Sequence, residues 1–454
     1  MRVEIPEKLK PVERIFTKAG AEAYAVGGLV RNALLGLPRT DVDICSRLWP
    51  EAVTALCEEA GLRTFDQGVR FGTVAILLPD GEKLEHTTFR ADSYGEGGAH
   101  RPEWVQFGES LEADAFRRDF SINALYAALE TGEVRDPTGG LRDLEAGRIR
   151  TTSADADDIL GSDALRVLRL VRFAAEFGFA IEAATWASAE RNAGKLADIS
   201  PERIREELDK ILLADLRYRR GDVLTALRRL DALRAFDVFW PELAEGRGHR
   251  QRPDVHRYDV LEHSLHVCAA MPPVRELRLA GLLHDVGKPA AKAKDGNYYA
   301  HDRYGETMAR EMLRRLRYDN AATARVCRLV RRHMYDIQGT AAEGTLRAAF
   351  GQWERDGTED MIAMREADVR GCGYNPDYAA RRWRALYEEM LRDNTPFSIG
   401  ELAVSGADVL AVGVPAGPPV GEALRRLWRH CLRHPQENIR ERLLKLLVNN
   451  RLNL

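Results

Sequence analysis

Two aspartates, Asp41 and Asp43, lie one residue apart and follow a glycine pair at Gly27 and Gly28. Successive residues of a β-strand point to opposite faces, so two residues apart in a strand project from the same face. Two adjacent carboxylates repel each other unless a cation lies between them. Mg²⁺ prefers oxygen ligands and keeps substrate phosphates in its shell. We therefore predict that Asp41 and Asp43 are catalytic residues that bind Mg²⁺.

The residues from the glycine pair to the aspartates can form an anion-binding site. A glycine pair lets the backbone approach a ligand closely, and the helix expected after it offers its N-terminal amide groups to a phosphate. Arg31, one turn into that helix, adds a guanidinium that can bind phosphate. Either motif alone is usually a solvated turn. The combination of strand, glycine pair, helix and paired aspartates favours metal-assisted phosphoryl or nucleotidyl transfer.

The strands and helices expected around these residues form a small domain of mixed type. Strands are predicted at AYAVGG, VDIC, GTVAILL and KLEHTTF, the last two joined by a hairpin turn at Pro79-Asp80-Gly81. From about residue 112, apolar residues recur at three- and four-residue spacing, which predicts helices nearly to the end of the chain. The expected fold class is α+β, a small mixed-sheet head followed by an all-α remainder.

Length and composition restrict the class of protein. The 454 residues predict three or four domains, and 45% hydrophobic with 30% charged residues is typical of a globular chain. The six cysteines form no CxxC pair, which argues against a zinc knuckle or a disulfide framework. We expect no membrane segment, no secretory signal and a cytoplasmic location. The net charge of −3 does not favour non-specific coating of nucleic acid.

The stretch AVGGLVRNALLGLPRTDVDIC, residues 25–45, resembles the signature of the class II tRNA nucleotidyltransferase and bacterial poly(A) polymerase superfamily, GG-x-VRD-x-LLG followed by DxD. Asn32 stands where that family usually has Asp, a residue that the resemblance implies supports the arginine. Ser162 stands where the family often has Glu. Further motifs match in the same order: RRDFSINALY (117–126), DPTGGLRDLEAGRIRT (136–151), SDALRVLRLVRFAAEFGF (162–179) and PERIREELDKIL (201–212).

The resemblance implies that Asp163 and Arg166 select the incoming nucleotide. Residues three apart on a helix share a face. A carboxylate can accept from a base amino group and a guanidinium can donate to a ring nitrogen or carbonyl, which lets the pair replace a template base. An ordinary helical ion pair is the alternative that these residues alone leave open. The expected nucleotide-binding residues are Gly28, Arg31, Arg117, Asp119, Asn123, Asp163, Arg166, Arg169 and Arg172.

Two features near the predicted hairpin bear on the same site. Glu85, on its second strand, is predicted as a third carboxylate near the metal, with a surface position as the alternative. The segment between Arg90 and Arg117 has the length and glycine content of a mobile loop. In the family that the chain resembles, such a loop permits addition of the terminal A, so it favours A addition or full CCA addition.

A second set of ligand-type side chains lies downstream, where LLHDVGK places His284 beside Asp285. Together with His263 and Asp368 they predict a cation site of mixed nitrogen and oxygen ligands. The set resembles an HD-type phosphohydrolase domain, which implies a divalent transition metal that generates hydroxide for attack on a phosphoester. His301 and His333 lie at matching positions, for a second ion or as structural histidines. Lys288, one turn after Asp285, is expected to bind a phosphate.

The resemblance implies four parts: a nucleotidyltransferase head (1–145), a helical neck and body that selects the nucleotide and binds RNA (146–250), an HD domain (251–385) and a helical tail (386–454). The predicted reaction is template-independent transfer of CMP and AMP from CTP and ATP to the 3′ end of tRNA, with an HD phosphohydrolase activity as an addition. The alternatives are an A-only tRNA nucleotidyltransferase, a poly(A) polymerase, and a metal-dependent HD phosphohydrolase with an RNA-binding head.

Overall fold

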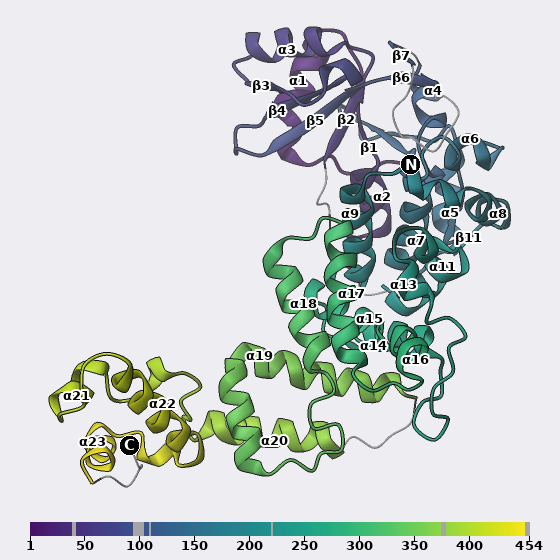
Figure 1. The fold of residues 1–454 in the computed structure, drawn as a ribbon. Coiled ribbons are helices and arrows are strands. Elements are labelled where there is room, and N and C mark those ends of the chain that lie inside the picture. Colours follow the sequence, from purple (N-terminus) through teal and green to yellow (C-terminus); the bar gives the residue numbers. More distant parts are fainter. Residues whose placement is uncertain (39–41, 94–103, 109, 219–220, 374–377, 450–454) are drawn as a thin grey trace. The chain divides into compact units, whose positions relative to one another are not determined.

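A computed structural model of the chain describes residues 1–38, 42–93, 104–108, 110–218, 221–373 and 378–449 (Figure 1). Asp41 and residues 94–103 of the predicted loop lie outside the described residues. The chain divides into two compact units, Met1–Pro241 and Glu242–Leu454. The four-part division at residues 145, 250 and 385 stays a prediction.

A seven-stranded mixed sheet forms the head of the first unit. Its order is β3-β4-β5-β2-β1-β8-β9; β2 and β5 run parallel, and the other neighbours run antiparallel. The predicted α+β class with a mixed-sheet head is confirmed. The strands are β1 (Ala23–Val26), β2 (Asp43–Ser46), β3 (Thr64–Asp66), β4 (Thr73–Leu77), β5 (Lys83–Thr88), β8 (Tyr126–Ala128) and β9 (Val134–Arg135).

Antiparallel hairpins join β3 to β4, β4 to β5 and β8 to β9 in this sheet, and the sequence predicts the second of them. The β4–β5 hairpin is confirmed, and its turn is closed by the Leu78 amide donating to the Glu82 carbonyl at 2.8 Å. The β8–β9 hairpin corrects the expectation of helices from about residue 112. Its turn needs Gly132, because φ is +69° and an added Cβ would lie 2.2 Å from the Val3 carbonyl oxygen.

Residues 90–116 contain regular structure where the sequence predicts a loop. Strand β6 (Arg90–Ser93) pairs antiparallel with β7 (Trp104–Phe107), and helix α4 (Leu111–Phe116) follows. The Ser110 hydroxyl accepts from the Ala113 amide at 3.2 Å and thereby caps α4. The described part of this segment is therefore a ribbon and a helix, which lead directly to the RRDF motif.

Helix α7 (Leu165–Phe177) lies in the helical part of the first unit. Nearly all of its residues are buried, and it packs against α9 and α11. It ends at Gly178, whose left-handed backbone is the usual helix stop. The other helices and short strands of this unit are α1 (Lys10–Lys18), α2 (Gly28–Leu35), α3 (Pro50–Glu59), α5 (Gly140–Glu145), α6 (Ala156–Leu160), α8 (Ala183–Asn192), α9 (Pro201–Leu212), α10 (Ala214–Arg217), α11 (Val223–Ala232), α12 (Ala235–Phe239), β10 (Arg148–Ile149) and β11 (Ala180–Ile181).

The second unit is helical in its described part. Helix α19 changes direction at Glu354, where φ is +62°. A separate apolar cluster, which includes Val409, Leu427 and Leu443, forms the core of its C-terminal part. None of the described helices has the length and apolar composition of a membrane span. The helices are α14 (Val260–Ala270), α15 (Arg275–Leu283), α16 (Lys288–Asp295), α17 (His301–Arg315), α18 (Asn320–Arg332), α19 (Glu343–Gly371), α20 (Tyr378–Arg392), α21 (Gly406–Ala411), α22 (Pro418–Arg433) and α23 (Arg440–Val448); α13 (Pro241–Ala244) lies at the unit boundary.

Candidate functional site

The glycine pair connects β1 to α2 at the end of the sheet where Asp43 lies. Gly27 has φ +67° and ψ −124°, a backbone conformation that other residues rarely adopt. Val26, the last residue of β1, pairs with Asp43, the first residue of β2. The N-terminal amide groups of α2 and the Asp43 carboxylate therefore meet at one end of the sheet.

Asp43 and Glu85 come from neighbouring strands. They are register partners in the parallel pair β2–β5, so both side chains project from the same face of the sheet. Asp43 is exposed, and Glu85 also accepts a hydrogen bond from Gln67 Nε2 at 2.5 Å. The structure thus places Glu85 beside Asp43. Carboxylates from adjacent strands are a donor set that fits Mg²⁺.

A cavity of about 600 Å³ lies between this end of the sheet and α7. It is lined by Asp43 and by all nine expected nucleotide-binding residues, whereas Glu85 is not among its lining residues. Four acidic side chains line it: Asp43, Asp119, Asp163 and Glu176. Eight basic side chains line it: Arg31, Arg117, Arg118, Arg166, Arg169, Arg172, Arg203 and Lys210. The excess of positive charge suits a polyphosphate ligand.

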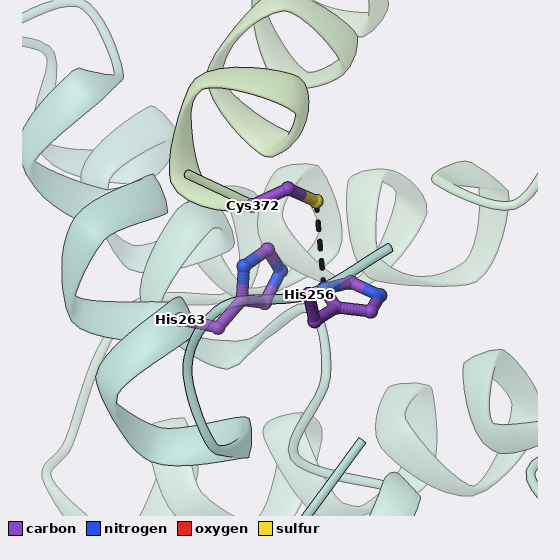
Figure 2. Close-up of side chains that lie close together, drawn as sticks. All are labelled: His256, His263 and Cys372. Carbon is purple, nitrogen blue, oxygen red and sulfur yellow. Dashed lines mark hydrogen bonds between the residues drawn. The ribbon is translucent and has the colours of Figure 1, made fainter. Parts of the chain in front are cut away.

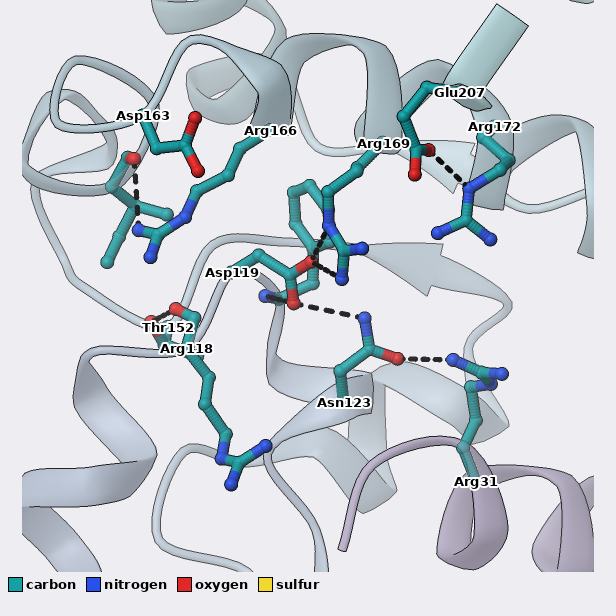
Figure 3. A network of polar contacts seen from close by, with 12 residues as sticks. Arg31, Arg118, Asp119, Asn123, Thr152, Asp163, Arg166, Arg169, Arg172 and Glu207 are labelled. Carbon is teal, nitrogen blue, oxygen red and sulfur yellow. Dashed lines mark hydrogen bonds and ion pairs between the residues drawn. The ribbon is translucent and has the colours of Figure 1, made fainter. Parts of the chain in front are cut away.

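A chain of hydrogen bonds crosses the cavity from α2 to α7 (Figure 3). Arg31 Nη1 donates to Asn123 Oδ1 at 2.5 Å, and Asn123 Nδ2 donates to Asp119 Oδ1 at 3.0 Å. Arg169 Nε then donates to Asp119 Oδ2 at 2.8 Å. Burial acts to raise the pKa of Asp119, but Arg169 and Asn123 lower it to about 2. Asp119 is therefore ionised at neutral pH; it holds Arg169 directly and Arg31 through Asn123.

Arg31 is buried and yet keeps its charge. Burial lowers its pKa to about 10, still well above neutral pH. Its guanidinium lies 4.7 Å from the ring centroid of Phe177 and 5.1 Å from that of Phe173. Asn32 Oδ1 accepts from Arg31 Nε at 3.1 Å and from Nη2 at 2.9 Å. Asn32 thus makes the supporting contact that the resemblance implies for the family's Asp.

The pair Asp163 and Arg166 lines the cavity in a way that differs from the expected helical pair. Asp163 precedes α7, because the helix begins at Leu165, so the two residues do not share a helix face. Arg203 Nη2 donates to Asp163 Oδ2 at 3.3 Å. Arg166 Nη2 donates to the Arg117 carbonyl at 3.0 Å. Each member of the pair is therefore held by a separate part of the first unit.

Two further arginines of the expected set are anchored by carboxylates. Arg172 Nε lies 2.6 Å from Glu207 Oε2, which ties α7 to α9. Arg117 Nη2 lies 2.6 Å from Asp114 Oδ1, and Asp114 is fully buried. Sequence reasoning missed these carboxylates and Arg203. The spacing of Asp114 and Arg117, three apart at a helix end, is the signal that could have indicated the first pair.

The six residues expected to bind metal in the HD domain come together in the second unit, and we call them the HD cluster. Their histidines and Asp285 are buried, and the Asp368 side chain is 13% exposed. They lie near helix ends, where the chain turns toward a common centre: His263 in α14, His284 and Asp285 directly after α15, His301 at the start of α17, His333 directly after α18, and Asp368 in α19.

One group of these side chains surrounds His263. Its Nε2 lies 3.1 Å from His284 Nε2 and 3.2 Å from Asp368 Oδ1. Asp285 Oδ2 lies 3.2 Å from His284 Nε2 and 3.5 Å from His263 Nε2. Lys288 Nζ lies 2.6 Å from the same oxygen. Four ligand atoms at such separations can surround one cation of the type that takes mixed N and O ligands.

The second oxygen of Asp285 faces another pair of histidines. Asp285 Oδ1 lies 3.2 Å from His301 Nε2 and 3.6 Å from His333 Nε2, and these two nitrogens are 3.0 Å apart. Asp285 therefore offers one oxygen to each group. A carboxylate placed in this way suits two neighbouring metal ions.

Backbone carbonyls orient three of the four histidines. Nδ1 of His284, His301 and His333 lies 2.9, 2.7 and 2.7 Å from a carbonyl three residues earlier. This contact directs Nε2 to the centre, as in metal sites. Burial acts to raise the pKa of Asp285, but His284 and Lys288 hold it well below its usual range. The centre thus has an ionised carboxylate and oriented imidazoles.

Comparison with known proteins identifies three family models along the chain. A poly A polymerase head domain matches residues 23–150, a probable RNA and SrmB-binding site of polymerase A matches 178–246, and an HD domain matches 254–410. The cavity residues fall in the first two matches or between them. The His and Asp cluster falls in the third.

Curated relatives are CCA-adding enzymes. That of Lactiplantibacillus plantarum is 45% identical over 204 residues, which cover 45% of this chain and 48% of that protein. The first of these alignments thus spans about half the relative's length. That of Geobacillus thermodenitrificans is 33% identical over 444 residues, which cover 96% of this chain and 95% of that protein.

Solved structures have the same fold. The Bacillus stearothermophilus CCA-adding enzyme in complex with CTP has a TM-score of 0.69 and 29% identity, and the match covers 98% of both chains. The Thermotoga maritima CCA-adding enzyme complexed with tRNA has a TM-score of 0.62 at 18% identity, which supports the fold alone. Because one relative is 33% identical along nearly the full length of both proteins, the chain belongs to the family of CCA-adding enzymes.

Proposed function

We propose that this chain transfers CMP and AMP from CTP and ATP to the 3′ end of tRNA, without a nucleic-acid template, to complete CCA. The observation that carries the proposal is the single cavity that gathers Asp43 and all nine expected nucleotide-binding residues. The relatives of this chain are named CCA-adding enzymes, which supports the choice of reaction. A cytoplasmic location fits this substrate and the free thiols of all six cysteines.

In the proposed reaction the tRNA 3′-hydroxyl attacks the α-phosphate of the bound nucleotide. The bond to the β-phosphate breaks, pyrophosphate leaves, and the hydroxyl proton passes to solvent. Arg31, held between Asn32 and Asn123, neutralises charge on the triphosphate. Asp43, with Asp41 and Glu85, would hold Mg²⁺, which when bound polarises the phosphates.

The proposed base-reading groups are Asp163 and Arg166. Arg203 donates to Asp163, and Arg166 donates to the Arg117 carbonyl, so each group is held in place. A fixed carboxylate and a fixed guanidinium can present one acceptor and two donors to the edge of a pyrimidine or purine. Fixed positions allow discrimination against bases whose donors and acceptors are arranged differently.

The test uses three tRNAs that end in the discriminator base, in C or in CC, each with CTP alone, ATP alone or both. We expect the wild type to extend all three to CCA and to stop there. Extension of the CC-ended tRNA alone would establish an A-only enzyme, and a long A tail would establish a poly(A) polymerase. Asp43→Asn is expected to abolish every extension, and Asp80→Asn, in the β4–β5 turn, serves as the control.

The two-sided placement of Asp285 favours a second activity, and we infer phosphoester hydrolysis at the HD cluster. A divalent transition metal held there would supply a metal-activated water, and Lys288 would bind the phosphate. Incubation with a 2′,3′-cyclic nucleotide is expected to yield a monophosphate, and Asp285→Asn should abolish this product. Asp43→Asn should leave it unchanged, since Asp43 belongs to the other unit. Hydrolysis that persists in Asp285→Asn would refute this activity.

A further inference from the structure

A cysteine lies at the edge of the HD cluster, in a position that neither activity uses. Cys372 follows α19, and its sulfur is 3.4 Å from Nδ1 of His256 (Figure 2). His263 completes the group, in which one ligand atom from each residue lies within 4.8 Å of the others. The rings of His256 and His263 are 4.9 Å apart and nearly perpendicular. Three donor atoms, one of them sulfur, thus face a common volume.

The backbone holds this group in place. The Arg257 amide donates to the Cys372 carbonyl at 3.0 Å, which fixes the segment carrying His256 to the end of α19. Gly373 has φ +74°, and an added Cβ would lie 3.1 Å from both Arg257 Cβ and the Tyr258 ring. Cys372 is also four residues after Asp368, so the thiol lies on the same helix face as an HD ligand. The three side chains are therefore held together by the fold.

His263 differs from the other histidines of the HD cluster. Its side chain is fully buried, and its Nδ1 has no hydrogen-bond partner within the described part of the chain. The other three histidines each place Nδ1 against a backbone carbonyl. A buried nitrogen without a partner costs free energy. His263 therefore lacks the carbonyl contact that fixes the other three rings, and an ion bound by this side chain would hold the ring in place.

The donor types indicate which ion would bind. Tetrahedral zinc has Zn–S bonds of about 2.3 Å and Zn–N bonds of about 2.0–2.1 Å, which separates neighbouring S and N ligands by roughly 3.5 Å. The observed separation of Cys372 Sγ and His256 Nδ1 is 3.4 Å. Thiolate and imidazole select zinc-like ions over Mg²⁺. We propose that Cys372, His256 and His263 bind a thiophilic divalent ion such as Zn²⁺ at the edge of the HD cluster.

Binding forms a metal–sulfur bond, and the thiol proton is released to the solvent. The three protein ligands leave a fourth position for water. His263 is shared with the HD cluster, so the ion also fixes the ring of an HD ligand. The proposal depends neither on nucleotidyl transfer nor on hydrolysis, because it concerns ion binding alone.

Cobalt substitution tests the sulfur ligand directly. The full-length protein, stripped with a chelator and titrated with Co²⁺, is expected to develop a near-ultraviolet sulfur-to-cobalt charge-transfer band. Cys372→Ser should eliminate the band, and His256→Ala should weaken Co²⁺ binding at least tenfold. Cys327→Ala removes another thiol of the same unit and should retain the band. Asp285→Asn should also retain it, which separates this ion from one held by the HD carboxylates.

Thiol labelling supplies an independent measurement. Cys372 is the partly exposed cysteine, whereas the other five are buried, so a thiol reagent should label Cys372 first in the folded protein. Zn²⁺ is expected to slow this labelling at least tenfold, and a chelator should restore it. Cobalt binding without a sulfur band, or labelling that Zn²⁺ does not slow, would overturn the proposal and leave the contact as a thiol–imidazole hydrogen bond.

Discussion

Asn32 holds Arg31 in position although it carries no charge. Its Oδ1 accepts two hydrogen bonds from the guanidinium, and its Nδ2 donates to the Pro38 carbonyl at 2.8 Å. An aspartate could accept the same two bonds but could not donate to Pro38. The amide therefore links the arginine to the segment that leads into the paired aspartates, and it leaves the arginine's charge available for a phosphate.

The first prediction concerns Asn32→Asp. The new carboxylate neutralises part of the Arg31 charge and leaves the Pro38 carbonyl without its donor. We expect the KM for CTP and ATP to rise several-fold and stability to fall by about 1–2 kcal/mol. Steady-state kinetics and urea unfolding measure the two effects. Tighter nucleotide binding in this variant would contradict the proposed role of the neutral amide.

The second prediction concerns the pH dependence of Asp119. Its folded pKa of about 2 lies below the unfolded value of about 3.9, so its stabilising effect is complete above about pH 4 and is lost as the pH falls through 2. We expect Asp119→Asn to lower the free energy of unfolding by about 2–3 kcal/mol at pH 7. Measured by denaturant unfolding, this loss relative to wild type should become smaller by pH 2.5. An equal difference at both pH values would show that the charge is unimportant.

At the scale of elements, α7 and α9 form one side of the cavity, and a buried ion pair joins them. Arg172 contacts Glu207 of α9 and Glu176 of α7, and its guanidinium lies 4.0 Å from the ring centroid of Phe173. The side chains of Arg172 and Glu207 are only 7% and 4% exposed. These contacts occupy Arg172, so it is expected to position the helix rather than bind phosphate.

The third prediction tests that positioning. Glu207→Ala leaves the buried Arg172 guanidinium without its main ion-pair partner. We therefore expect the free energy of unfolding to fall by about 3–5 kcal/mol. The double variant Arg172→Met with Glu207→Leu removes both charges and should recover part of the stability. If Arg172 only positions α7, the double variant keeps a KM for CTP within about threefold of wild type. A much larger increase in KM would place Arg172 in contact with the nucleotide.

At the scale of the whole molecule, the two candidate sites belong to different units. Every residue that lines the proposed nucleotide cavity lies before Pro241, and every proposed metal ligand of the HD cluster lies after it. Each centre is built from contacts within its own unit. Ligands of one unit should therefore change the stability of that unit first.

The fourth prediction compares two ligand effects on thermal unfolding of the full chain. CTP with Mg²⁺ at a hundred times its Kd should stabilise the first unit by about 2.7 kcal/mol. A chelator should lower the unfolding temperature of the second unit, because the clustered carboxylates and imidazoles lose their cation. Domain-specific probes, such as a fluorophore placed in each unit, distinguish the transitions. A chelator effect limited to the first unit would contradict the metal assignment of the HD cluster.

Residue types and spacing were enough to predict the α+β class, the β1–α2–β2 order, the β4–β5 hairpin and most of the side chains that meet at the two candidate sites. Those features depend on local signals: a glycine pair, an Asp-Gly turn, apolar spacing and motifs in order. Three other features follow from the three-dimensional fold alone: β8 and β9 extend the sheet, Asp163 stands before α7, and Cys372 meets His256. Each of these depends on packing between distant segments, which hydrophobic periodicity along the chain does not record.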